Sequence, residues 1–138
     1  MASENQWAID LESTVVALVK AKALPQLKSK YPNIKITDEE SSSTSAVFPT
    51  VYIHILGGNE RGKTLDGQSI NALSATFQVD VTANTSKADC RRVMGTVMEI
   101  FKQMRFEGSQ MPEMSINNKI HRSVARFSRI IAANDRLL

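Results

Sequence analysis

The sequence predicts an α+β fold, a two-layer sandwich whose mostly antiparallel sheet carries two amphipathic helices packed on one face. Residues 48–56 and 72–84 alternate apolar and polar side chains and are joined by a long glycine-bearing loop, a pattern typical of antiparallel strands. Residues 86–106 follow with an apolar stripe at helical spacing. No crossover helix separates the other strand-like runs, so strands adjacent in sequence are expected to pair antiparallel.

Size and composition favour one globular domain covering residues 1–138. No apolar run approaches the roughly 20 residues of a membrane helix, and the first seven residues lack the basic start and apolar core of a signal peptide. Cys90 is the sole cysteine. An internal disulfide and a cysteine metal cluster are therefore excluded, and a reducing compartment is favoured.

The first third of the chain predicts a helix, a turn and a short strand. Ser3 and Gln6 have the spacing of a capping box, and an apolar stripe follows until Pro25 interrupts or kinks the helix. That stripe consists of Trp7, Leu11, Val15, Leu18 and Val19. Residues 31–36 predict a turn and then a short strand, and the acidic, serine-rich residues 38–45 predict an exposed loop.

The two central strands should each have one buried face. In the first strand, Val51, Ile53 and Ile55 share a face, and Pro49, which has no amide hydrogen, belongs at the strand start or at an edge. The second strand is the clearest in the chain because its apolar and polar residues alternate strictly. Its expected buried residues are Ala75, Phe77, Val79, Val81 and Ala83, and its polar residues are Thr76, Gln78, Asp80 and Thr82.

The helix over residues 86–106 has recognisable ends. Ser86 suits the N-cap and Asp89 the first turn, while Gly108 is a natural terminator. The apolar stripe between these ends consists of Cys90, Val93, Met94, Val97, Phe101 and Met104. A helix with such a stripe packs on the sheet.

The last segment predicts a final strand whose faces are ambiguous. Residues 111–118 predict weak structure or a short strand that ends in a turn, and residues 120–131 predict a long strand. Arg129 shares one parity with apolar residues, whereas Arg122 and Arg126 share the other parity, also with apolar residues. A bulge would resolve this conflict, but the sequence does not place one.

Residues 57–64 match the phosphate-loop pattern G-x-x-x-x-G-K-[ST] and follow a strand. A phosphate loop must open directly into a helix whose first amides face the phosphates. Here Gly67 stands where helical residues should run, and the chain then enters a strand that holds Asp80, the nominal magnesium ligand, at its middle. The favoured interpretation of residues 57–71 is a flexible hairpin loop.

Other catalytic patterns are missing from the sequence. His54 and His121 are the only histidines, and nothing in their spacing requires a shared metal. Cys90 lies on the helical stripe, as a core thiol would, and no nucleophile has a recognisable base nearby in sequence. We therefore expect no enzyme activity, no metal and no cofactor.

Basic groups gather near the C-terminus. The last twenty residues hold five of them against Asp135 alone. Arg122 and Arg126 lie on one side of a strand about 13 Å apart, a spacing that can meet phosphates without reading bases. The two open interpretations are contact with a polyanion and a solvated or subunit-contacting strand.

In order and spacing, almost the whole chain resembles the small tail-terminator (tail-completion, minor tail) proteins of long-tailed bacteriophages. The resemblance is carried by the helix over residues 9–27, Tyr31-Pro32, residues 48–53 with their loop, residues 77–81, and the helix and strand over 88–104 and 120–127. Each motif is weak by itself, because the family has no catalytic signature.

The resemblance implies a virion protein, assembled in the host cytoplasm, that forms a ring of usually six copies. Such a ring caps the tail tube, joins it to the head connector and encloses a channel for DNA, and no membrane is involved. The implied partners are further copies of the chain, the tail tube protein, the connector or head-closure protein and, transiently, DNA. Applied to this sequence, the resemblance implies a loop that docks onto a neighbouring subunit or the tail, with the residues Gly58, Asn59, Glu60, Arg61, Lys63 and Asp66. It also implies that the candidates for facing the lumen or DNA are Lys119, Arg122, Arg126 and Arg129.

Two alternatives stay open at the level of sequence. One is a head-closure or neck adaptor of the same virion. The other is a nucleotide-binding protein that uses residues 57–64.

Overall fold

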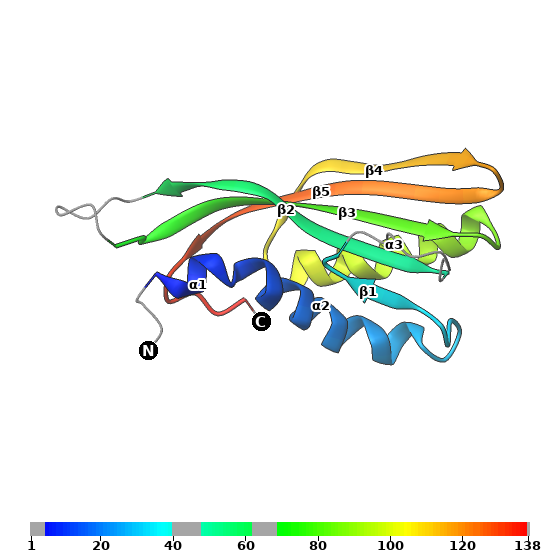
Figure 1. The fold of residues 1–138 in the computed structure, drawn as a ribbon, viewed down its shortest axis with the longest axis horizontal. Helices are drawn as coiled ribbons and strands as arrows, with labels where there is room; N and C mark the ends of the chain where they lie inside the picture. The colour runs from blue at the N-terminus through cyan, green and yellow to red at the C-terminus, as the bar shows by residue number, and fades with distance from the viewer. Residues whose placement is uncertain (1–4, 40–47, 62–68, 138) are drawn as a thin grey trace.

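The structure is a computed structural model that describes residues 5–39, 48–61 and 69–137 of the 138-residue chain. It has a mixed α+β fold with a mostly antiparallel sheet, as predicted. The elements in chain order are α1 (Gln6–Ile9), α2 (Leu11–Leu27), β1 (Lys35–Thr37), β2 (Thr50–Arg61), β3 (Ala72–Ala83), α3 (Lys87–Gln103), β4 (Glu107–Asn117) and β5 (Ile120–Ala132). In the view of Figure 1, the helices lie below the long, twisted strands.

The sheet has the strand order β1-β2-β3-β5-β4. Three of its four pairings are antiparallel, but β1 pairs parallel to β2, so the expectation that all sequence neighbours pair antiparallel was wrong at this point. Residues 38–49 separate the two strands, which is length enough for the chain to return to the same end of the sheet before β2 begins.

The N-terminal helix is longer than its proline implies. α2 continues through Pro25 to Leu27, because the proline falls in the last turn and few backbone bonds remain beyond it. Asn5 precedes α1 without a side-chain capping bond, and Ser3 lies outside the described residues. The expected stripe does face the core, with Leu11 among the buried residues.

α3 begins as predicted and ends differently. Ser86 is the N-cap, and its hydroxyl accepts a hydrogen bond from the Asp89 amide. Arg105, with φ of +67°, takes the left-handed position that was expected of Gly108. The Phe106 amide donates to the Phe101 carbonyl, which closes the helix end and buries the Phe106 ring.

Two strands are longer than expected. β2 runs on to Arg61, with a bulge between Ile55 and Gly58 at which Gly57 has φ of +112°. β4 is an 11-residue strand that includes Gly108, where weak structure or a short strand was predicted. Both segments lack clear alternation, and backbone pairing with the neighbouring strand compensates for it.

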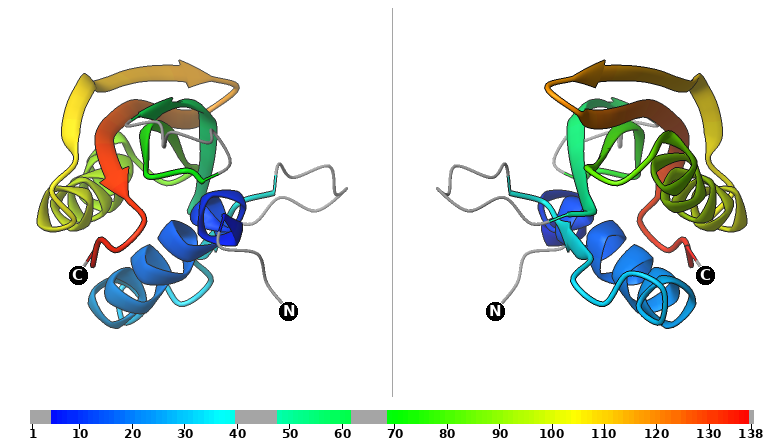
Figure 2. Two further views of the ribbon diagram at one scale, coloured as in Figure 1. Left: turned by 90° about the vertical axis from the view of Figure 1, so that its left-hand side faces the viewer. Right: turned by 90° about the vertical axis from the view of Figure 1, so that its right-hand side faces the viewer.

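The core lies between the helices and one face of the sheet. All five expected β3 residues are buried, and the Phe101 ring of α3 stacks on the Phe127 ring of β5 at 4.6 Å between centroids. Figure 2, which looks along the long axis of the molecule from each end, shows the sheet curving over the helices. One face of β2, β3 and β5 is therefore covered, and none of the described helices lies on the other face.

The pairing of β5 with β3 resolves the ambiguous parity. The register runs without interruption from Ala83 opposite His121 to Ala72 opposite Ala132, and the register shifts occur in β4 instead. Ser123 and Phe127 are therefore on the covered face together with Arg129. Arg122 and Arg126 are on the opposite face.

Candidate functional site: the polar face of the sheet

The helix-free side of the sheet carries a surface rich in polar side chains, called here the polar face. Successive side chains of a strand point to opposite sides, so the residues that alternate with the buried set define it. Its polar members on the three central strands include Tyr52, His54, Thr76, Gln78, Asp80, Thr82, Arg122, Arg126 and Ser128, and the apolar Val124 lies between the two arginines. The sequence placed the four β3 residues together, but it could not place the arginines beside them.

A hydrogen-bonded network crosses β3 and β5. Arg122 Nη2 donates to Asp80 Oδ2 at 2.8 Å, and Arg126 Nε donates to the Gln78 side-chain oxygen at 3.1 Å. Gln78 Nε2 donates in turn to Asp80 Oδ1 at 3.1 Å. The Arg122 side chain is 50% exposed whereas that of Asp80 is only 13% exposed. The strands thus hold the two guanidinium groups in fixed places while leaving them open to solvent.

Beside this network, β2 contributes an aromatic pair to the polar face. The Tyr52 and His54 rings stack at 4.5 Å between centroids, and His54 stands opposite Gln78 in the β2–β3 ladder. His54 Nδ1 is buried without a hydrogen-bond partner in the described part of the chain. Among the buried side-chain nitrogen and oxygen atoms of the described polar face, this nitrogen is the one without a hydrogen-bond partner.

Farther along the strands the polar face becomes less charged. Thr76 and Ser128 share a hydroxyl–hydroxyl bond of 3.1 Å, and the exposed apolar side chains of Leu56 and Ile130 lie toward this end. The surface therefore combines a charged part, built on Asp80 and the two arginines, with a part around Thr76 and Ser128 that carries hydroxyl and apolar side chains and is bordered by Glu107 of β4.

The four basic candidates do not share one surface. Arg122 and Arg126 lie on the polar face, and Lys119 is exposed in the two-residue turn between β4 and β5, where Asn118 and Lys119 both have positive φ. Arg129 lies on the covered face instead. Its grouping with the others as a DNA-facing residue is corrected by the continuous register of β5.

Arg129 secures the end of the chain. Its Nη1 donates to the Met104 carbonyl at 2.9 Å, and its Nη2 contacts the Asp135 carboxylate at 3.1 Å. The side chain is 10% exposed, and burial lowers the pKa of its guanidinium, although Asp135 opposes that shift. These contacts give Arg129 a structural role.

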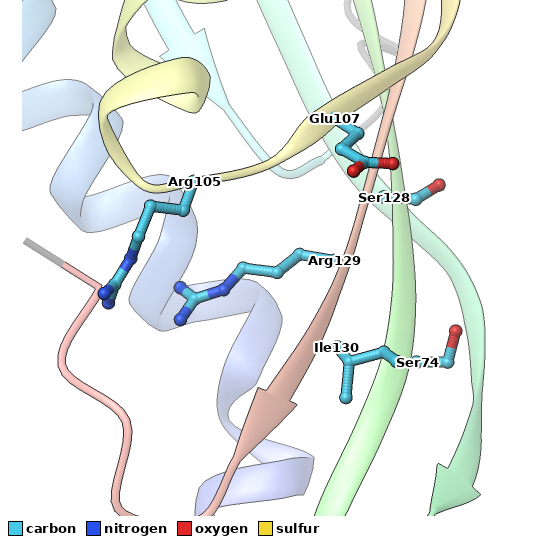
Figure 3. Close-up of a pocket in the computed structure, with 6 residues that line it drawn as sticks. All are labelled: Ser74, Arg105, Glu107, Ser128, Arg129 and Ile130. Carbon is cyan, nitrogen blue, oxygen red and sulfur yellow. The ribbon is translucent and has the colours of Figure 1, made fainter.

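A hollow of about 280 Å³ beside Arg129 does not form a converging site. Figure 3 shows the Arg105 and Arg129 guanidinium groups pointing toward the C-terminal segment, whereas the hydroxyls of Ser74 and Ser128 point the other way. A bound anion would need these donors to meet at one point.

The docking-loop candidates are divided between strand and undescribed residues. Gly58, Asn59, Glu60 and Arg61 belong to β2 and pair with residues 72–75 of β3, so the prediction that they lie in a loop was wrong. Lys63 and Asp66 lie outside the described residues. Antiparallel pairing through the first half of residues 57–64 also contradicts phosphate-loop geometry, which needs the strand to lead into a helix.

No other chemistry gathers in the residues that the structure describes. They hold no group of three His, Cys, Asp or Glu side chains placed to bind a metal. His54 stands opposite Gln78 and His121 opposite Ala83, so the two histidines are apart on the sheet. The Cys90 thiol is buried, and burial raises its pKa, which disfavours the reactive thiolate. The described helices include none with the length and apolarity required to cross a bilayer.

Comparison with known protein families gave no matching family model, and comparison with curated proteins gave no match.

Proposed function

We propose that this chain is a non-enzymatic structural protein of a long-tailed phage virion, a tail terminator that forms a ring on the last ring of the tail tube. The ring offers its far side to the head connector and encloses the channel through which DNA passes. The observation that carries the proposal is the polar face, a helix-free surface spread over three adjacent strands with two fixed, exposed arginines.

The chemistry of that face suits transient contact with DNA. Arg122 is paired with the Asp80 carboxylate, so its charge is partly balanced before any phosphate arrives, whereas Arg126 is held by the neutral Gln78 amide and keeps its full charge. Phosphate contacts of this kind carry no sequence information. A wall of such groups attracts a polyanion weakly and lets it move on.

Exposed apolar side chains support assembly with other proteins. Leu56, Met111, Ile116 and Ile130 are all exposed, and they lie on strands rather than on flexible tails. The start of β3 also extends beyond α1 in Figure 1. Such side chains on projecting strands are suited to contacts with neighbouring subunits or with the adjoining ring.

The mechanism follows from repetition. Each tube ring presents a surface that binds the next ring, and a terminator binds that surface without recreating it. Weak contacts repeated around a ring add through avidity, so a small interface on each subunit is sufficient for tight capping.

Electron microscopy of the purified protein, alone and mixed with tail tubes that lack a terminator, tests this proposal. We expect rings with a central hole, and tubes capped at one end that no longer lengthen. A ring that binds isolated connectors but leaves tube ends open would identify a neck adaptor instead. Monomers that leave growing tubes unaffected would contradict both functions.

A further inference from the structure

We infer that copies of this chain join head to tail through their sheet edges, with the second half of β4 (Glu113–Asn117) of one copy pairing with β1 of the next copy. The inference rests on the proposed ring and identifies the contact that closes it. β1 and β4 are the two outer strands of the sheet, so each has one edge that no described strand covers.

The β4 edge is protected along only half of its length. Two register shifts and Pro112, which lacks an amide hydrogen, interrupt the first half of the strand. Bulges and prolines are devices that keep an edge strand from pairing with other chains. From Glu113 to Asn117 the register is regular and no such device is present. This half can therefore accept another strand.

The two edges lie at the same height in the sheet. One rung of the sheet begins at Lys35 on β1, which stands opposite Thr50 on β2. The same rung continues through Thr82 on β3 and Arg122 on β5 and ends at Ser115 on β4. In the same way, Thr37 leads across β2, β3 and β5 to Glu113. Because β1 and this half of β4 share rungs, a neighbouring copy can continue the sheet without sliding along the strand direction.

The strand directions also fit. β1 is parallel to β2, and the other three pairings are antiparallel, so β4 runs opposite to β1. A copy rotated about an axis along the strands would bring the two edges together as an antiparallel pair, which is the more stable arrangement. Such a contact joins two different surfaces, and its repetition forms a ring when the rotation between neighbouring copies divides a full turn.

Charge selects this pairing over pairing of like edges. Within the half of β4 that pairs, Glu113 is the one charged residue, and it is on the same side of the sheet as Lys35 of β1. Lys35 also lines a groove of about 400 Å³ between α2 and β1, to which α2 and its C-cap contribute Lys20 and Lys28. A lysine or a glutamate on an edge repels a second copy of that same edge. Opposite charges remove the repulsion only when β4 meets β1.

Apolar surface on the helix side completes the fit. The Ile116 side chain is 64% exposed although it lies on the covered side of the sheet, one rung beyond Ser115. The groove beside β1 has Leu24 and Ile34 among its lining residues, and Ile34 is one residue before Lys35. In the joined sheet, Ile116 would therefore enter that groove.

Cysteine cross-linking tests the register directly. The variant that combines Lys35→Cys with Ser115→Cys should form disulfides between copies, because opposed Cα atoms in an antiparallel pair lie about 4.5–5.5 Å apart. Non-reducing gels should show a ladder that ends at the size of the ring seen by microscopy. The native Cys90 is buried and adds no background. Matched controls are Lys35→Cys alone and Lys102→Cys combined with Ser115→Cys, since Lys102 is exposed on α3.

A charge swap provides a second test. Lys35→Glu and Glu113→Lys should each weaken association about tenfold, because each places like charges at both contacts of every subunit. The double variant should recover most of the affinity.

Microscopy separates the two ways in which the inference can fail. Rings that form in the charge variants as readily as in the native chain, without specific cross-links, would overturn the edge pairing and leave the proposed function standing. Monomers throughout, with tubes left uncapped, would overturn both.

Discussion

The hydroxyl of Tyr31 donates a 2.8 Å hydrogen bond to the Asp89 carboxylate and so joins the turn before β1 to the first turn of α3. Arg92 donates to the same hydroxyl at 3.0 Å, and Thr85 donates to the other carboxylate oxygen. Burial, followed by the bond to Asp89, raises the pKa of Tyr31, so the hydroxyl stays protonated. This cluster connects α3 to the segment that leads into β1.

Tyr31→Phe should lower the free energy of unfolding by about 1–2 kcal/mol, because it removes one hydrogen bond to a charged group and preserves the ring. Urea denaturation measures the decrease. The same substitution in an Asp89→Asn background should cost clearly less, since the two residues act on one bond. Strictly additive decreases would show that the bond contributes nothing.

Protonation of Asp89 should make the protein less stable at acidic pH. Hydrogen bonds, first from Thr85 and then from Tyr31, lower the pKa of Asp89 below its ordinary value of 3.8. A lowered folded-state pKa gives stabilisation that is complete above the unfolded-state pKa and is lost as the pH falls through the folded-state pKa. Asp89→Asn should therefore flatten the pH dependence of the urea midpoint below about pH 5. An unchanged slope between pH 5 and acid unfolding would contradict this.

The two faces of β5 should respond differently to removal of an arginine. Arg129→Met leaves the Met104 carbonyl and the Asp135 carboxylate without this partner, and it should cost about 2 kcal/mol. Arg126→Met, on the polar face, should stay within about 0.5 kcal/mol of the native chain. Chemical denaturation of both variants gives the comparison. Equal decreases in stability would mean that Arg129 is not the structural member of the pair.

DNA contact should depend on the polar face. In the assembled protein, combining Arg122→Gln with Arg126→Gln should lower the slope of log affinity against log salt by about 0.9 for each phosphate that an arginine no longer neutralises. Arg91→Gln is the matched control, because Arg91 is an exposed arginine on α3. Filter binding over a series of salt concentrations measures the slopes. A similar decrease in the control would assign the effect to net charge alone.

Replacing residues 62–68 with an Asn-Gly turn should leave the monomer folded but prevent tail joining. The replacement retains the paired residues 58–61, which belong to the sheet, and also Ile70, whose amide donates to Asn5. Thermal unfolding checks the fold, and complementation of terminator-deficient tails checks joining. Normal joining by this variant would show that residues 62–68 are not needed for docking.

The sequence predicted the elements whose apolar residues repeat at the spacing of a strand or a helix. In β3, strict alternation identified the buried set, because the pleat sends successive side chains to opposite faces. In α3, the apolar stripe and the Ser86 cap located the helix start. Local chemistry was sufficient in both cases.

Where pairing decides the structure, the sequence was insufficient. β4 is exposed along most of its length and so shows no apolar alternation. Residues 58–61 have the composition of a loop and become a strand only because β3 supplies a partner. Which face of β5 carries Arg122 and which carries Arg129 could be decided only from the β3–β5 register. The polar face was therefore half predictable, since its β3 residues were grouped correctly and its arginines were not.

Because β1 is short, it should separate from the sheet before the central strands do. Only three residues hold it to β2, and it lies at an edge. Its amides should exchange with deuterated solvent sooner than those of the central strands, since local fraying needs far less energy than global unfolding. If a neighbouring copy closes over β1, this segment would change from the first part of the sheet to fray into one that opens only when the ring itself comes apart.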